Sequence, residues 1–182
     1  MISLKTKPKI RNVVCTANLE QKVDVIKLSG LTCGIYDEAI YGGRCGYIKT
    51  PEMDGRVTVF RSGKMISVGG KSIAKAIQQL KHAKFFLVKE NMIQDTIITP
   101  KIQNIVATAD LGQNLPIDNL SSRIAGAIYD PETFPSIILK GLHSCTFLIF
   151  ASGKIVIIGA KSIEETSSSL FELLQKLNKF LE

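Results

Sequence analysis

The chain has 182 residues, 45% of them apolar, and a formal net charge of +7. No apolar run reaches the roughly 18 to 20 residues of a membrane-spanning helix, and the first residues lack the apolar stretch of a secretory signal. The composition therefore excludes a helical membrane protein. We expect a globular protein inside the cell, with one core or two small fused ones.

The positive charge is concentrated in the first half of the chain. Residues 1–91 carry 16 Lys and Arg against 7 Asp and Glu, or +9, whereas residues 92–182 carry 7 against 9, or −2. A basic balance favours a nucleic-acid partner. The alternative is a solvated, lysine-rich helix face, because several of these lysines fall on one predicted helix.

In chain order, a short polar lead over residues 1–8 precedes an alternating strand pattern. A short helix, two strands and a hairpin around a Ser-Gly-Lys turn follow, and Ser72 is a suitable N-cap for a long helix with an apolar stripe. The ranges predicted for these elements are 9–19, 23–31, 43–49, 56–61, the hairpin 57–72 and the helix 72–91.

The second half repeats this order of elements. Its strands and short helix are predicted over 101–111, 117–125, 137–142, 146–150 and 155–159, with a turn over 129–135. The C-terminal helix has an apolar stripe made of Ile163, Leu170, Leu174, Leu177 and Leu181.

Residue identities repeat as well. Phe60, Ser62, Gly63, Lys64, Gly69, Lys71 and Ser72 recur 90 positions later as Phe150, Ser152, Gly153, Lys154, Gly159, Lys161 and Ser162. The segment 9–14 recurs at 101–106. A long unit that occurs twice predicts a pseudo-twofold domain rather than a solenoid, which needs three or more units. We therefore divide the chain into a lead (1–8), a first repeat (9–91) and a second repeat (92–182).

The hairpin strands are apolar on both faces, since Ile155 and Ile157 point one way while Val156 and Ile158 point the other. Tight hairpins make an antiparallel sheet, and the helices can shield only one side of it. The uncovered side would present Val14, Phe60, Ile66, Val68, Val106, Leu148, Phe150, Val156 and Ile158. Such a face is rarely left in water, so it needs a large, flat partner: another subunit, a second sheet or a nucleic-acid groove.

Catalysis and metal binding are poorly supported by the sequence. The four cysteines lack zinc-ligand spacing and are expected to be free thiols. His82 and His143 have no Cys or carboxylate nearby at the spacing of a metal site or a triad. Asp118 sits where a helix N-cap belongs rather than in an acid/base pair with Asp110. We expect no enzyme, no metal site and no cofactor.

Three motifs carry a resemblance to a known family. Residues 101–111, residues 129–135, and Phe150-Ala-Ser-Gly-Lys154 followed by Gly159-Ala-Lys-Ser162 resemble the core domain of the TATA-box-binding protein family, over nearly the whole chain. The resemblance implies an α+β fold of two pseudo-symmetric repeats, with a saddle-shaped, ten-stranded antiparallel sheet and four helices on its convex face. This family is itself the standard example of minor-groove binding by apolar wedges, so those properties are the family's.

The resemblance implies a general transcription initiation factor. Such a protein binds and bends the minor groove of A·T-rich, TATA-like promoter DNA, and recruits a B-type initiation factor and RNA polymerase. The minor groove of A·T pairs offers only acceptors, so its recognition tolerates an apolar surface with few polar groups. This would explain the uncovered face.

The resemblance also assigns roles to residues on that face. Asn12 and Asn104 would donate to the base acceptors, and Val14 and Val106 would pack beside them. The wedge positions are Phe134 and Phe150 in the second half, and Tyr41 and Phe60 in the first, where Tyr41 replaces a phenylalanine. Val68 and Ile158 replace the family's central threonines, and Ile66, Leu148 and Val156 line the face.

Phosphate contacts are implied for the two hairpin turns and for the starts of the long helices. The residues are Ser62, Lys64, Lys71, Ser152, Lys154 and Lys161. An arginine of the family that contacts phosphate falls near Tyr47 in the first half and near Lys140 in the second. Such contacts position a protein on DNA without reading sequence.

The resemblance implies protein partners too. The B-type factor would bind beside the second wedge loop, at Asp130, Glu132 and Thr133, and the basic helix 72–89 is a candidate regulator surface. A homodimer of the free protein is a further expectation, and no membrane association is expected. The protein would be on DNA, in the nucleus of a eukaryote or in the cytoplasm and nucleoid of an archaeon.

A second interpretation stays open. The chain could be a paralogue with the same fold that acts as a protein-interaction or regulatory module without TATA-specific binding. Tyr41, Tyr47, Val68 and Ile158 favour it, whereas the paired asparagines and the phenylalanines favour DNA binding.

Overall fold

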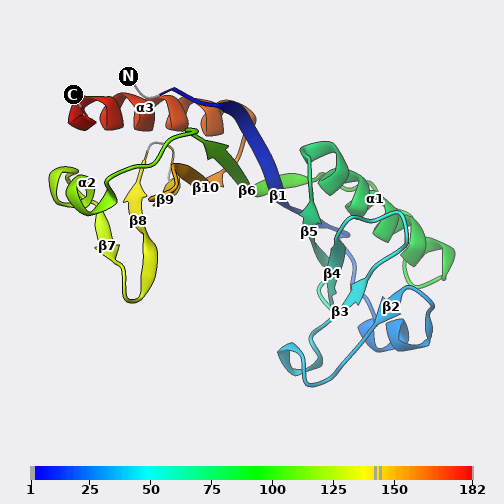
Figure 1. Cartoon of the computed structure of the whole chain (residues 1–182). Helices are drawn as coiled ribbons and strands as arrows, with labels where there is room; N and C mark the ends of the chain where they lie inside the picture. Colours follow the sequence, from blue (N-terminus) through cyan, green and yellow to red (C-terminus); the bar gives the residue numbers. More distant parts are fainter. Residues whose placement is uncertain (1–2, 142, 144, 182) are drawn as a thin grey trace. The chain divides into compact units, whose positions relative to one another are not determined.

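The computed structural model describes residues 3–141, 143 and 145–181 (Figure 1). The elements of the first half are β1 (Thr6–Asn18), η1 (Val25–Gly30), β2 (Gly34–Ile35), η2 (Tyr41–Gly43), β3 (Cys45–Ile48), β4 (Arg56–Phe60), β5 (Lys64–Gly70) and α1 (Ile73–Lys89). Those of the second half are β6 (Lys101–Asp110), α2 (Ile117–Arg123), β7 (Ile128–Asp130), β8 (Phe134–Lys140), β9 (Thr146–Phe150), β10 (Lys154–Ala160) and α3 (Ile163–Leu181). Both η segments are 3-10 helices.

The ten strands make one antiparallel sheet in the order β2-β3-β4-β5-β1-β6-β10-β9-β8-β7. The chain divides into two compact units, Asn12–Gln103 and Met1–Arg11 with Asn104–Glu182. These division points fall inside β1 and β6, so each of these strands contributes residues to both units. The α+β class with ten antiparallel strands, expected from the sequence, is confirmed.

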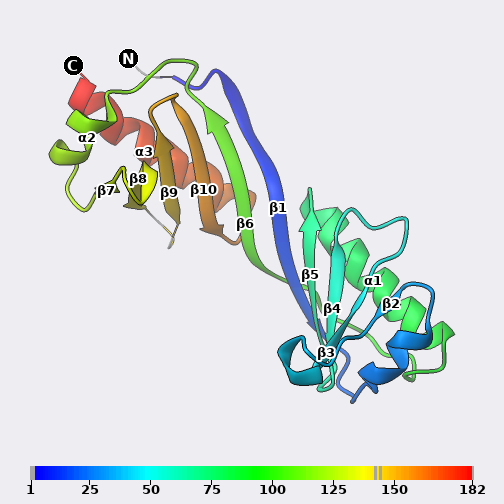
Figure 2. The same cartoon turned by 60° about the horizontal axis from the view of Figure 1, so that its bottom comes forward.

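In the unit Asn12–Gln103, α1 lies along one face of β4 and β5 (Figures 1 and 2). The helix begins where it was predicted, because the hydroxyl of Ser72 accepts a hydrogen bond from the backbone N–H of Lys75 at 3.2 Å. The buried residues of α1 are Ala76, Gln79, Leu80, Ala83 and Leu87, and those of the two strands are Val57, Val59, Met65 and Ser67. This spacing gives the unit a core on the helix side of its sheet.

In the other unit, α3 covers one face of the sheet at β10 (Figure 2). The buried residues on this side are Ile105, Ala107, Phe147, Ile149, Ile155 and Ile157 from the strands, and Leu170, Leu173 and Leu177 from α3. Two members of the predicted stripe differ from this finding. Ile163 is 52% exposed because it stands in the first turn of the helix, and Leu173 rather than Leu174 is fully buried. The side chain of Leu181 lies outside the described residues.

The other differences from the predicted elements are local. β1 begins at Thr6, so the last three residues of the predicted polar lead, 6–8, are strand, and the backbone N–H of Lys5 donates to the carbonyl of Asp110 at 2.8 Å. The short first-half helix is a 3-10 helix. The predicted turn 129–135 contains the ends of two strands, β7 and β8, which pair with each other. Within the described residues, no helix is long and apolar enough to cross a membrane.

Candidate nucleic-acid interface

The sheet face opposite the helices is apolar and partly exposed in each unit. In the unit Asn12–Gln103 it carries Val14, Phe60, Ile66 and Val68, which alternate with fully buried neighbours. In the other unit it carries Val106, Leu148, Phe150, Val156 and Ile158. The predicted alternation is therefore confirmed, and the structure places all nine of these residues on the uncovered side, which we call the open face.

Each unit has a β-bulge at the same point of the repeat. Gly69 in β5 and Gly159 in β10 have positive φ values of 87° and 106°, and the strand register shifts beside both. A bulge leaves a backbone N–H without a partner in the ladder. The side-chain oxygen of Asn12 accepts from the Gly69 N–H at 2.7 Å, and that of Asn104 accepts from the Gly159 N–H at 2.8 Å.

These two hydrogen bonds fix the orientation of the asparagine amides. Only the amide oxygen can accept from an N–H, so Oδ1 must face the bulge in both residues. The NH₂ group, which can only donate, then lies on the other side of Cγ. Both side chains are half-buried, so each presents donors beside the apolar residues Val14 and Val106.

Two phenylalanines of the second repeat contact each other. The rings of Phe134, at the start of β8, and Phe150, at the end of β9, contact edge to face with centroids 6.0 Å apart. Phe134 is 39% exposed although it is large and apolar. The strand register places Phe134 opposite Asp130 and Phe150 opposite Ser136, so backbone pairing sets the position of both rings.

The loop before Phe134 is held by Asp130. Its carboxylate accepts from the Thr133 hydroxyl at 2.7 Å and from the Glu132 N–H at 3.2 Å. The hydrogen bond from Thr133 is the main cause that lowers the pKa of Asp130. All three residues of the predicted partner site are exposed, with Asp130 shaping the loop and Glu132 leaving its carboxylate at the surface.

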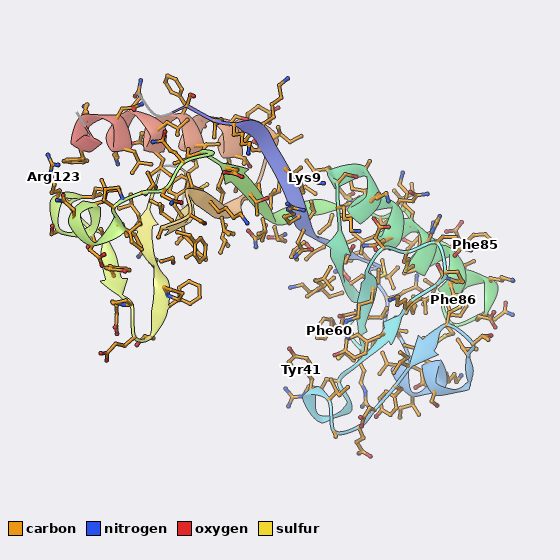
Figure 3. All side chains as sticks on the ribbon, in the orientation of Figure 1. Lys9, Tyr41, Phe60, Phe85, Phe86 and Arg123 are labelled. Carbon is orange, nitrogen blue, oxygen red and sulfur yellow. The ribbon has the colours of Figure 1, made fainter. Side chains whose placement is uncertain are left out.

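In the first half, the two residues at the predicted wedge positions, Tyr41 and Phe60, have different surroundings from Phe134 and Phe150. Tyr41 is 70% exposed and lies in the turn η2, where Tyr41, Gly42 and Gly43 all have positive φ values. Figure 3 shows Tyr41 on this turn and Phe60 on β4. In the part of the chain that the structure describes, no ring contact like that of Phe134 with Phe150 joins these two residues.

The predicted phosphate-contact residues are all exposed. Ser62 and Lys64 stand at one hairpin turn, Ser152 and Lys154 at the other, and Lys71, Lys140 and Lys161 lie elsewhere on the surface. Each hairpin has a glycine with positive φ at its turn, Gly63 at 89° and Gly153 at 77°. A Cβ at either glycine would collide with a backbone carbonyl, of Gln21 and Gln113 respectively, which explains why both turns need glycine.

Sequence reasoning missed a cation on this face. Tyr47 is only 8% exposed, and the guanidinium of Arg56 stacks over its ring at 4.3 Å from the centroid. The exposed charge near the family's arginine position is therefore that of Arg56, one strand away. The strand period of β4 could have indicated this position, because it places Arg56 on the same face as Phe60.

Each unit also has an open groove. The groove in the unit Asn12–Gln103 has a volume of about 510 Å³, and that in the other unit about 540 Å³. The repeat relates their linings, because Thr16, Ser62 and Lys64 in the first correspond to Thr108, Ser152 and Lys154 in the second. Phe150 lines the second groove.

In residues 3–141, 143 and 145–181, no cluster of three His, Cys, Asp or Glu side chains could hold a metal ion. Cys15, Cys45 and Cys145 are buried free thiols and Cys33 is a half-buried one, as expected from their spacing. Burial raises the pKa of the Cys15 thiol.

Comparison with known proteins gives a consistent result. A sequence model of the family described as "Transcription factor TFIID (or TATA-binding protein, TBP)" matches residues 7–87 and 99–180. A protein named "TATA-box-binding protein" from Cenarchaeum symbiosum is 56% identical over 178 residues, which cover 98% of each chain. A protein of the same name from Methanocaldococcus jannaschii is 32% identical in a match that covers 96% of this chain and 95% of its own.

A solved structure is similar as well. The structure described as "Methanococcus jannaschii TBP" has a TM-score of 0.86 and 29% sequence identity with this chain. The match covers 96% of this chain and 99% of the other.

Proposed function

The chain belongs to the TATA-binding protein family, and we propose that it is a transcription initiation factor that binds and bends the minor groove of A·T-rich promoter DNA with its open face. The observation that carries this proposal is the paired orientation of Asn12 and Asn104. In each repeat a bulge holds the amide oxygen, so that two donors remain beside an apolar surface.

This arrangement matches the chemistry of one DNA surface. The minor groove of A·T pairs presents adenine N3 and thymine O2, which are acceptors, whereas a G·C pair adds the N2 amino donor of guanine. Amide donors among valines can donate to the acceptors of an A·T pair, whereas they would face the amino donor of guanine in a G·C pair. Val14, Val106 and the other open-face residues would pack against the sugars and base edges, which need no polar partner there.

Bending is the second part of the proposal. Phe134 and Phe150 form an edge-to-face pair in the second repeat, and side chains of this kind unstack a base step when they enter the minor groove. Phe60 would act in the first repeat, with the exposed Tyr41 as a neighbour whose hydroxyl needs water or a phosphate. The exposed lysines of the two hairpin turns would hold the backbone.

Recruitment of a B-type initiation factor and RNA polymerase belongs to the same proposal. Glu132 is exposed beside Phe134 on a loop that Asp130 holds in shape, which suits a basic surface on a partner protein. The three relatives and structures named above come from archaea, which favours the archaeal alternative and a place on nucleoid DNA. A homodimer of the free protein and a regulator on the basic helix α1 stay proposals.

The test is a fluorescence titration with two end-labelled duplexes, one A·T-rich and TATA-like, the other G·C-rich, at two salt concentrations. We expect tight binding with a bend on the A·T-rich duplex only. Phe134→Ala and Phe150→Ala should each weaken binding about 10- to 100-fold and reduce the bend. Phe171→Ala, a matched change of a side chain that is 63% exposed on α3, should have no effect.

The competing function is that of an interaction module without TATA-specific binding. The exposed Tyr41 and its irregular turn favour it, because the first-half wedge lacks the paired ring of the second half. Equal, steeply salt-dependent binding of both duplexes without a bend would support that function and contradict DNA recognition.

A further inference from the structure

Arg11 and Gln103 occupy equivalent positions in the two repeats and make the same contact. Arg11 Nε donates to the Thr108 hydroxyl at 2.9 Å, and Gln103 Nε2 donates to the Thr16 hydroxyl at 2.8 Å. Each pair lies within one unit, and both threonines line the groove of that unit. The residue that donates to the threonine is therefore a cation, Arg11, in the second-repeat unit and a neutral residue, Gln103, in the first-repeat unit.

Two further cations line the groove beside Arg11. Lys7 and Lys9 precede Arg11 by four and two residues on β1, and Figure 3 labels Lys9 on this strand. At the equivalent positions, the other groove has Thr99 and Lys101. Both grooves contain one hairpin lysine, so the second-repeat groove has four cations and the first-repeat groove has two.

These three cations are free to bind a ligand. Lys7, Lys9 and Arg11 are exposed, and none of them belongs to an ion pair among the residues that the structure describes. The carboxylate in the same groove, Asp110, accepts a hydrogen bond from the backbone N–H of Gly112 at 2.7 Å, which holds it toward its own turn.

We propose that Lys7, Lys9 and Arg11 form a phosphate-binding edge for the DNA backbone next to the wedge residue Phe150. The proposal rests on the proposed function, since DNA is the occupant. These three residues precede the first repeat's core in the chain but belong to the second-repeat unit, because residues 1–11 pack with residues 104–182.

Charge and position both support a nucleic-acid backbone as the occupant. Phe150 lines the same groove, and the phosphates that flank an unstacked base step lie next to the wedge that opens it. Cations on the wall of that groove are then close to negatively charged phosphates of the duplex. Arg11 suits this role, because its anchored Nε leaves the Nη groups to donate to phosphate oxygens.

The experiment measures the salt dependence of binding to the A·T-rich duplex. Each phosphate contact contributes about −0.9 to the slope of log K against log salt. Arg11→Gln, which installs the side chain found at position 103, should make the slope shallower by about 0.9 and keep the contact to Thr108. Lys7→Gln with Lys9→Gln should make it shallower by about 1.8.

Two matched variants complete the design. Gln103→Arg should make the slope steeper by about 0.9, because it adds the missing cation to the other groove. Lys81→Gln removes one exposed lysine from α1, on the helix side, and should leave the slope unchanged. Thermal melting confirms that each variant is folded.

The outcomes separate this edge from the proposed function. The unmodified protein could bind and bend the A·T-rich duplex while neither Arg11→Gln nor the double variant Lys7→Gln with Lys9→Gln changes the salt slope. That result would overturn the phosphate-binding edge alone. An effect of Lys81→Gln as large as that of Arg11→Gln would overturn it too, since net charge would then suffice. No binding of the A·T-rich duplex would overturn the proposed function and the edge together.

Discussion

The side-chain oxygen of Asn104 accepts a hydrogen bond from the backbone N–H of Gly159 at 2.8 Å. The same bond in the first repeat joins Asn12 to Gly69. In the function we propose, one side chain has two tasks, because its oxygen accepts from a bulged backbone N–H while its nitrogen donates to DNA. The two tasks can be separated by substitution.

Asn104→Asp tests the donor without removing the acceptor. A carboxylate still accepts from the Gly159 N–H, but it cannot donate, and its charge would face the acceptors of the A·T groove. We expect binding of the A·T-rich duplex to weaken about tenfold or more, with a melting temperature close to that of the unmodified protein. Asn119→Asp, the same change on the exposed surface of α2, is the control.

Gly63→Ala should destabilise the protein by about 2 kcal/mol or more. The φ of Gly63 is 89°, and an added Cβ would collide with the backbone carbonyl of Gln21, which cannot rotate away as a side chain could. Urea unfolding measures the effect. Gly30→Ala is the matched control, since nothing lies within 4 Å of the added Cβ, and an equal loss in both variants would contradict this account.

Gln79 holds a buried polar network in the first repeat. Its Oε1 accepts from the Gly55 N–H at 2.6 Å and its Nε2 donates to the Ser67 hydroxyl at 2.7 Å. Gln79→Leu leaves the part-buried Gly55 N–H and the buried Ser67 hydroxyl without this partner, so we expect a loss of about 2 to 4 kcal/mol in the free energy of unfolding. Gln78→Leu, at the exposed neighbouring position, should change stability by less than about 0.5 kcal/mol.

The loop at Asp130 should respond to pH. Its carboxyl pKa is lowered, chiefly by the hydroxyl of Thr133, so the contribution of this contact is present above the ordinary carboxyl value of about 3.9 and is lost as pH falls through the lower folded-state pKa. Thr133→Val should raise the pKa of Asp130 toward its ordinary value, whereas Thr133→Ser should keep it low. An NMR titration of the carboxyl carbon measures both, and equal pKa values in the two variants would refute the role of the hydroxyl.

The faces of the sheet could be predicted from local sequence alone. In 155–158 every second residue is buried, as the period of a strand requires, and the same holds around Phe60. Ser72 marked the start of α1 because an N-cap is a local hydrogen bond between residues three positions apart. The family resemblance added a proposed role for this face, DNA binding, since its motifs recur in both halves.

Contacts between distant segments could not be predicted in this way. The partners of Arg11, Asn12 and Asp130 depend on strand register, bulges and loop closure. Tyr47 was buried by its strand neighbours while Arg56 became the exposed charge, which no spacing along the chain indicates. The helix α3 turned Leu173 toward the sheet and left Ile163 in solvent because the sheet beneath it sets its rotation.

The sequence by itself determined the repeat, the alternation of the strands, the caps and the glycine turns, because each depends on neighbouring residues and on backbone geometry. Only the tertiary structure decided that β1 starts at Thr6 and that Lys7, Lys9 and Arg11 line a groove with Phe150. The physical reason is that hydrogen-bonded strand pairing joins residues far apart in the chain, and its register selects which side chains share a surface.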